Sequence, residues 1–252
     1  MIKNRSCPGR WCAIWTVMLN FALPLSVNPS FAQDVVGPIV GTVESTTANI
    51  LYRPGITETK LRLSLRAQGE LQQRVMATAS AENDYVAKFS IKGLEPTTVY
   101  TYEIADASGR VLVPADQKYA FRTANPARQG GRVTVSFASC VDSEPNKIWN
   151  EMAALGTETV FLMGDTPYID SSDLGVVRDR HRKFLQVPGL AALGAHTSVV
   201  GTWDDHDFGR NNGNGRNMMS GKGLTRQAFM EYRAHSQSVS YTHLTLPTIA
   251  VV

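Results

Sequence analysis

Three apolar runs of the sequence each end in side chains that could hold a metal ion. The run RVTVSFASC ends at Cys140, and TETVFLMGD ends at Asp165, with Tyr168 three residues further on. The run TSVVGTW is followed by carboxylates, an imidazole and amides: Asp204, Asp205, His206, Asp207, Asn211 and Asn212. Because adjacent carboxylates repel one another, this crowding indicates a bound cation. A hard divalent or trivalent ion, which takes carboxylate and phenolate oxygens together, would suit these donors.

These three runs are predicted strands of an α/β sheet. Near-continuous apolar strands suit burial on both faces of a sheet. Segments with helical spacing, such as EPNKIWNEMAAL and DLGVVRDRHRKFLQ, separate them, and we expect Ser143 to cap the first helix with Pro145 in its first turn. Ligands gather at the carboxyl ends of strands in such sheets, so the candidate side chains should meet at one edge. A second ion, bridged to the first by Asp165, would favour phosphate ester chemistry.

The part of the chain before this sheet has the pattern of a β-sandwich. Roughly seven short alternating runs, with turn residues between them, occupy residues 34–123. The segment GLEPTTVYTYEI is similar to the part of fibronectin type III domains that carries the tyrosine corner, with Tyr100 bonding to the chain upstream. The segment ANPARQGG has the composition of a linker.

The N-terminal segment, residues 1–32, is predicted to be a Sec-type signal peptide. A basic start precedes an apolar stretch, and Ser30 and Ala32 are small residues at the spacing for cleavage after Ala32. The alternative is a membrane anchor, which Asn20 and Pro24 disfavour because they interrupt the apolar run. We therefore expect a secreted, periplasmic or cell-surface protein, with no membrane span after cleavage and Cys140 as its one thiol. A buried, inert thiol is the alternative for Cys140.

The other end of the chain, residues 238–252, differs in style from the rest. The string VSYTHLTLPT back-translates into a sequence that resembles a sequencing-library adapter, so we interpret this tail as an artefact. The alternative is a real β-strand. On the first interpretation the natural protein continues past about Gln237.

Charge gives no reason to expect a nucleic acid or a membrane surface as partner. Without the first 32 residues the chain holds 22 basic and 22 acidic residues. A neutral body has no basic patch by composition.

The motifs together resemble a known family. GDTPY matches the GDxxY element of purple-acid-phosphatase-like metallophosphoesterases. WDDHDFGRNN resembles the third block of the alkaline phosphatase D (PhoD-type) family, and SFASC resembles its first block, which uses a cysteine where relatives use an aspartate. The resemblance covers about residues 34–237.

This resemblance implies a set of site roles. Cys140, Asp165 and Tyr168 would hold Fe(3+), and Asp165 and Asp205 would hold Ca(2+), with other divalent metals as alternatives. His206 would contact the phosphate or protonate the leaving group, and Asn211 or Asn212 would orient the phosphate or complete the second metal site. Hydrolysis would use metal-bound hydroxide, with Asp205 and His206 as the catalytic pair and no phosphoenzyme.

Several neighbouring residues are expected to play lesser parts. Asp142 and Asp170 would lie behind the ligands or face solvent, and Asp204 would point away from the metals. Asp207 would either cap a helix or support a ligand. His181, in the charge run RDRHRK, would lie on a solvated helix face.

The resulting prediction is an α+β multi-domain chain. An N-terminal fibronectin-III/Ig-like β-sandwich (33–124) and a linker (125–131) precede the first part of an α/β metallophosphoesterase domain (132–237). The function expected is that of an exported hydrolase of phosphate-ester small molecules or phosphodiesters, with the 252-residue chain itself inactive. The alternative is a cell-surface β-sandwich binding module with a degenerate phosphatase-like domain. The substrate and the oligomeric state stay open.

Overall fold

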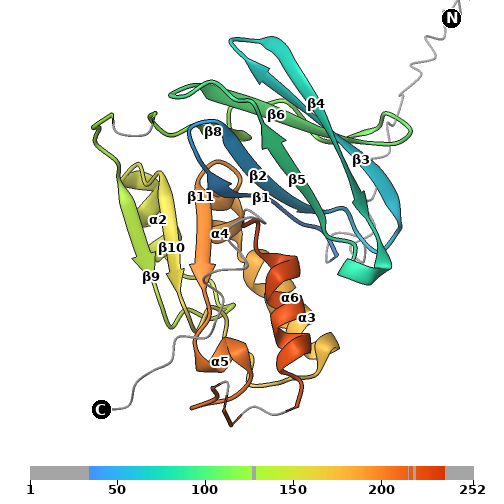
Figure 1. Cartoon of the computed structure of the whole chain (residues 1–252), viewed down its shortest axis with the longest axis vertical. Helices are drawn as coiled ribbons and strands as arrows, with labels where there is room; N and C mark the ends of the chain where they lie inside the picture. The colour runs from blue at the N-terminus through green and yellow to red at the C-terminus, as the bar shows by residue number, and fades with distance from the viewer. Residues whose placement is uncertain (1–33, 127–128, 215, 218–219, 236–252) are drawn as a thin grey trace, which may run out of the picture.

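The structure is a computed structural model that describes residues 34–126, 129–214, 216–217 and 220–235. The predicted signal peptide (1–32) and the predicted artefactual tail (238–252) lie outside the described residues. Figure 1 shows a β-sandwich packed against a smaller unit in which helices lie beside a three-stranded sheet. None of the described helices is long and apolar enough to cross a membrane.

The first half of the chain forms two facing antiparallel sheets, as the alternating pattern predicted. Residues of one parity along each strand point inward, so that Leu61, Leu63 and Leu65 are fully buried. One sheet contains β1 (Val36–Val43), β2 (Thr47–Arg53) and β5 (Ala87–Lys92). The other contains β4 (Glu70–Ala79), β3 (Thr59–Ala67), β6 (Val99–Asp106), β7 (Val111–Val113) and β8 (Ala120–Arg122). The sequence pattern missed only β7, because three residues are too few to show alternation.

The predicted tyrosine corner is confirmed. The main-chain amide of Glu95 donates a hydrogen bond of 2.9 Å to the hydroxyl oxygen of Tyr100. The Tyr100 ring stacks on Phe121 at 5.7 Å, which ties β6 to β8 inside the sandwich core.

The second unit is a parallel sheet in the order β11–β10–β9, with its strand ends at one edge. Its strands are β9 (Val135–Ala138), β10 (Thr159–Met163) and β11 (Ser198–Thr202). Its helices are α2 (Ile148–Ala154), α3 (Leu174–Leu185), α4 (Pro188–Gly194), α5 (Asp205–Phe208) and α6 (Lys222–Tyr232); a 3-10 turn, η1 (Ala81–Asn83), belongs to the sandwich. Met163 pairs with Thr202 and Leu162 with Ala138, so the three strands end together.

Two local expectations are wrong. Helix α2 begins at Ile148, outside the reach of Ser143 and Pro145, and the side chain of Asn146 accepts the Ile148 amide at 2.9 Å instead. His181 is fully buried rather than solvated, because α6 packs over α3 and the Tyr232 ring stacks on it at 5.7 Å. Neither ring nitrogen of His181 has a hydrogen-bond partner among the described residues.

The two units meet in a hydrophobic cluster to which both contribute, separate from the core inside the sandwich. A single cluster contains Val36 and Leu51 of the sandwich together with Trp149 and Leu190 of the second unit. The hydroxyl of Tyr102 donates to the carbonyl of Ala195 at 2.6 Å, so the sandwich also bonds directly to the loop before β11.

A group of paired charges borders this shared cluster; we call it the Asp84 network. Asp84, in the sandwich, accepts from Arg53 at 3.3 Å and from Arg182 of α3 at 2.6 Å. It also accepts a hydrogen bond from the hydroxyl of Tyr232 at the end of α6. Beside it, Arg178 of α3 binds Glu231 through two nitrogens, at 2.7 and 2.8 Å. These contacts fix α3 and α6 to each other and to the sandwich.

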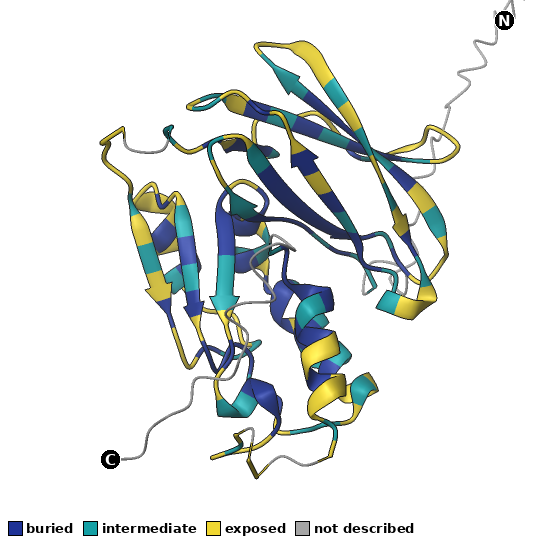
Figure 2. Ribbon diagram, in the orientation of Figure 1, coloured by how far each residue is buried: buried dark blue, intermediate teal, exposed yellow. Residues whose placement is uncertain are grey.

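The outer face of the three-stranded sheet carries exposed apolar side chains. Val135, Phe137 and Met163 are 44%, 60% and 50% exposed, and the ring of Phe161 stacks on Phe137 at 5.4 Å. Figure 2 shows exposed segments along β9 and more buried segments along β10 and β11. Burial on both faces was expected, and for the described residues it is wrong, because only one face of the sheet is covered.

Candidate metal site

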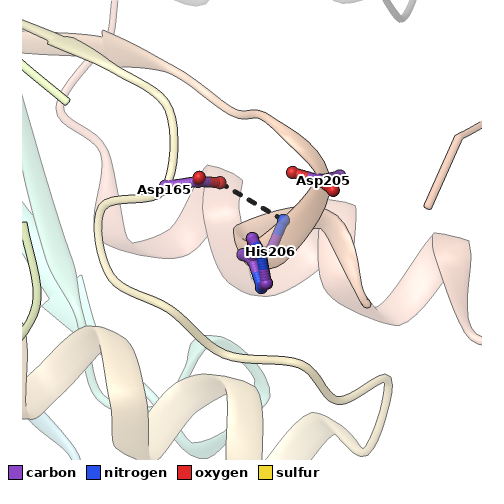
Figure 3. Close-up of side chains that lie close together, drawn as sticks. All are labelled: Asp165, Asp205 and His206. Carbon is purple, nitrogen blue, oxygen red and sulfur yellow. Dashed lines mark hydrogen bonds between the residues drawn. The ribbon is translucent and has the colours of Figure 1, made fainter. Parts of the chain in front are cut away.

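Three side chains meet beyond the ends of β10 and β11. One ligand atom from each of Asp165, Asp205 and His206 lies within 4.8 Å of the others. Asp165 follows β10, while the other two begin α5 (Figure 3). The site therefore forms at the edge of the sheet where parallel strands end together, as the strand pattern predicted.

Tight backbone packing brings the loops after β10 and β11 into contact. A Cβ on Gly164 would lie 2.5 Å from the Cβ of Asp204, so only glycine fits before Asp165. Asp165 and Cys140 both adopt left-handed backbone conformations, with φ of 51° and 56°. Such residues are held there by their surroundings at a cost of about 1–3 kcal/mol and cluster at functional sites. Here the amide of Val141 donates to the Asp165 carbonyl at 3.2 Å, which links the loop after β9 to the loop after β10.

The acidic residues near Asp205 have different roles: some support the fold, and others face the candidate site. Asp207 is fully buried, and its side chain accepts the main-chain amide of Asp204 at 2.6 Å at the start of α5. Burial raises the pKa of Asp207 to about 7. Asp207 thus supports the first turn of α5, which is the role left open for it, while Asp205 projects into the cluster (Figure 3).

Cys140 and Tyr168 lie beside Asp165. The thiol of Cys140 is 3.7 Å from a carboxylate oxygen of Asp165, and the residue is exposed, so the buried-thiol alternative is wrong. A hydrogen bond with Cys140, together with the nearby Asp165 and Asp205 carboxylates, raises the pKa of Tyr168 to about 12. The structure therefore brings together the first five predicted site residues: Cys140, Asp165, Tyr168, Asp205 and His206.

His206 is held from two sides. Its Nδ1 lies 2.7 Å from a carboxylate oxygen of Asp170, and its ring meets the Tyr168 ring edge-on at 4.7 Å. Its main-chain amide donates to Asp165 at 3.3 Å, and its carbonyl accepts the amide of Asp170 at 3.0 Å. Partial burial lowers the pKa of His206, but the Asp170 bond and the neighbouring carboxylates outweigh this and raise it. The sequence contains no local signal for this pair, because Asp170 is exposed and 36 residues away.

The two asparagines lie next to Asp205 but outside the three-residue cluster. The main-chain amide of Asn212 donates to the Asp205 carboxylate. The side chain of Asn212 donates to that of Asn211 at 2.5 Å, and both residues are exposed. In this arrangement their side chains pair with each other rather than with the carboxylates.

The donors fit a bound cation. Among the described residues, no lysine or arginine forms an ion pair with Asp165 or Asp205. Burial and the charges of Asp205 and Asp165 raise the pKa of Asp204, a sign of uncompensated negative charge. Thiol, phenol, carboxylate and imidazole groups are the side chains that iron and harder cations bind in proteins.

Comparisons with known proteins show which folds this chain resembles. No protein-family profile matches the sequence, and no curated protein matches it either. Among solved structures, one titled Structure of PhoD aligns with a TM-score of 0.69 and 18% identity, over 82% of this chain and 47% of that one. The purple acid phosphatase PPD1 from yellow lupin (Lupinus luteus) seeds aligns with a TM-score of 0.60 and 13% identity, over 81% and 41%.

At these identities the likeness concerns the fold alone. The chain spans less than half the length of either phosphatase. Within that span it has a phosphoesterase-like fold, with a candidate metal site of Asp165, Asp205 and His206 at the carboxyl edge of its parallel sheet.

Proposed function

We propose that this chain is part of an exported, metal-dependent phosphoric ester hydrolase. The observation that carries the proposal is the cluster of Asp165, Asp205 and His206, which has no basic ion-pair partner among the described residues and lies on a phosphatase-like fold. Export rests on the predicted signal peptide with cleavage after Ala32, which N-terminal sequencing of the secreted protein would test.

The ligand roles follow the donor chemistry. Cys140, Asp165 and Tyr168 would hold an iron ion, and Asp165 and Asp205 would hold a calcium ion or another divalent metal. When bound, these ions supply Lewis acidity, which neutralises phosphate charge and makes water more acidic. Asp165 lies between Cys140 and His206, so it is the residue that both ions would share.

His206 lies among the candidate metal donors, and the family resemblance gives it the role of contacting the phosphate or protonating the leaving group. Asp170 occupies Nδ1, so Nε2 remains to donate to a phosphate oxygen or to protonate the leaving group. Asn211 and Asn212 would contact the phosphate only after their mutual hydrogen bond opens.

The alternative, a binding module with a degenerate second domain, makes a different prediction. A sandwich that acts alone has no need of a shared core or of a clustered set of metal donors. The core that joins Val36 and Trp149 favours the enzyme, because it makes the sandwich part of the same folded unit as the site.

Metal content and turnover of the longer natural polypeptide would test the proposal. Iron and calcium should copurify with it, and it should hydrolyse p-nitrophenyl phosphate or its bis-ester. Asp165→Ala should lower turnover by more than about 100-fold, because even residues behind metal ligands contribute 10–100-fold. The matched control is Asp179→Asn, a carboxylate on α3 whose ion-pair partners among the described residues are Arg182 and Lys183. An Asp165→Ala variant that kept both metals and full activity would contradict the proposal.

A further inference from the structure

Arg233, directly after α6, is a buried charge that the proposed site does not use. Only 2% of the residue is exposed, and among the described residues it forms no ion pair. Burying a guanidinium without a paired carboxylate is unfavourable, and an apolar side chain of similar volume would fill the same space at lower cost. Fold stability alone therefore does not account for an arginine here.

The contacts of Arg233 lead to the candidate metal site. Its Nη2 donates to the main-chain carbonyl of Thr166 at 2.6 Å, and its Nη1 reaches the carbonyl of Tyr232 at 3.5 Å. Its guanidinium lies over the ring of Phe229, 5.0 Å from the centroid, while its Nε has no partner. The shortest polar contact of this side chain is thus to the residue that follows Asp165.

Thr166 is held on both of its main-chain groups. Arg233 binds its carbonyl, and its amide points to the buried carboxylate of Asp207 at 3.5 Å. Thr166 itself is fully buried and is followed by Pro167 and Tyr168. A shift of this one residue would move Asp165 and Tyr168 together, since they lie on either side of it.

We propose that Arg233 is a positioning residue for the candidate metal site. Arg233 holds the main chain of Thr166 so that Asp165 and Tyr168 point at the same ion. This inference rests on the proposed function. Its positive charge also interacts favourably with the carboxylate of buried Asp207, which binds the Thr166 amide. Arg233 thereby acts through Thr166 and does not itself touch the metal or the substrate.

Terbium(III) gives a test that does not depend on activity. Tb3+ is a hard, oxygen-binding ion whose emission is excited through nearby tyrosine and tryptophan rings. It therefore reports both affinity and how close those rings, Tyr168 and Trp203 among them, lie to the ion. In Arg233→Met we expect the Tb3+ dissociation constant to rise by about 10-fold or more, the effect of removing a group behind metal ligands. The emission of the saturated variant should also fall. Arg233→Lys, which keeps the charge and one donor, should restore part of both.

The matched control is Arg53→Met. Arg53 is another buried arginine, 1% exposed, that donates to main-chain carbonyls, but it lies in the Asp84 network. Its loss should lower the melting temperature and leave Tb3+ affinity and emission unchanged. Unchanged affinity and emission in Arg233→Met, or an equal loss in Arg53→Met, would overturn the inference. If Arg233→Met does not fold, Arg233→Lys becomes the test variant. Tb3+ affinity and emission equal to those of the wild type in Arg233→Lys would then overturn the inference. If the wild-type chain binds no Tb3+, the proposed function fails first.

Discussion

Two groups of acidic residues in this molecule lie in opposite electrostatic surroundings. In the Asp84 network, the carboxylate lies between Arg53, Arg182 and the hydroxyl of Tyr232. Burial raises the pKa of Asp84, but these partners outweigh it and hold the pKa below its ordinary value. At the candidate metal site, Asp165 and Asp205 lie close together beside His206, and no lysine or arginine of the described part of the chain forms an ion pair with either carboxylate.

The carboxylate of the Asp84 network stabilises the fold, whereas Asp165 and Asp205 keep negative charges that a bound cation would neutralise. A carboxylate that is saturated with donors inside the protein contributes to stability and has little left to offer a ligand. A carboxylate whose neighbours are also acids lowers stability until a cation arrives. The two groups should therefore respond in opposite ways to mutation and to metal.

The largest stability effect is expected in the Asp84 network. Asp84→Ala leaves buried Arg53 with only its longer pair to Asp34, at 3.6 Å, so the free energy of unfolding should fall by up to about 3–5 kcal/mol. Urea denaturation of the metal-free protein would measure this. Asp205→Ala, by contrast, should leave the stability of the metal-free protein unchanged or slightly higher, because it removes repulsion. An equal loss in both variants would erase the distinction.

Metal should stabilise the protein through the other group. An ion that binds only the folded state at 100 times its dissociation constant adds about 2.7 kcal/mol to the free energy of unfolding. Calcium titrated against the melting temperature should show this in the wild type and in Asp179→Asn. The increase should vanish in Asp165→Ala. A calcium response that survives in Asp165→Ala would place the ion elsewhere.

His181 offers a smaller effect with a pH signature. Burial, and secondarily the charge of Arg233, lowers the folded-state pKa of His181 well below its usual value. The unfolded chain takes up the proton below about pH 6.5 while the folded one does not, so stability falls by up to about 1.4 kcal/mol per pH unit as pH drops below that point. His181→Leu should remove this part of the slope and add about 1 kcal/mol at neutral pH, because two unpaired ring nitrogens disappear. A slope equal to that of the wild type in urea titrations at several pH values would refute the assignment.

The smallest effect concerns the pair of Asp170 and His206 at the candidate metal site. Asp170→Asn should lower the pKa of His206, since it removes a charged hydrogen-bond acceptor. Stability should change by less than about 1 kcal/mol because Asp170 is exposed. NMR titration of the imidazole would show the shift, with Asp173→Asn as a control. An unmoved His206 pKa would mean that the Asp170 contact is absent in solution.

The sequence predicted the strand ends and their donors because each donor follows directly on an apolar run. It could not predict the contacts that come from loops folding back, such as Asp170 with His206 or Arg233 with Thr166. The prediction that His181 lies on a solvated helix face was wrong because it rested on the charges of its neighbours Arg180, Arg182 and Lys183. The helical spacing of Val177, His181 and Phe184, all buried, carries the correct signal.

The core that joins the sandwich to the second unit bears on the inheritance of these parts. A segment cut at the linker after Ala124 would leave Val36 and Leu51 without the helices that cover them. The sandwich is therefore not an independent domain that could be exchanged between proteins on its own. The two units should melt in a single transition, and a recombination event that preserves the candidate metal site has to carry both.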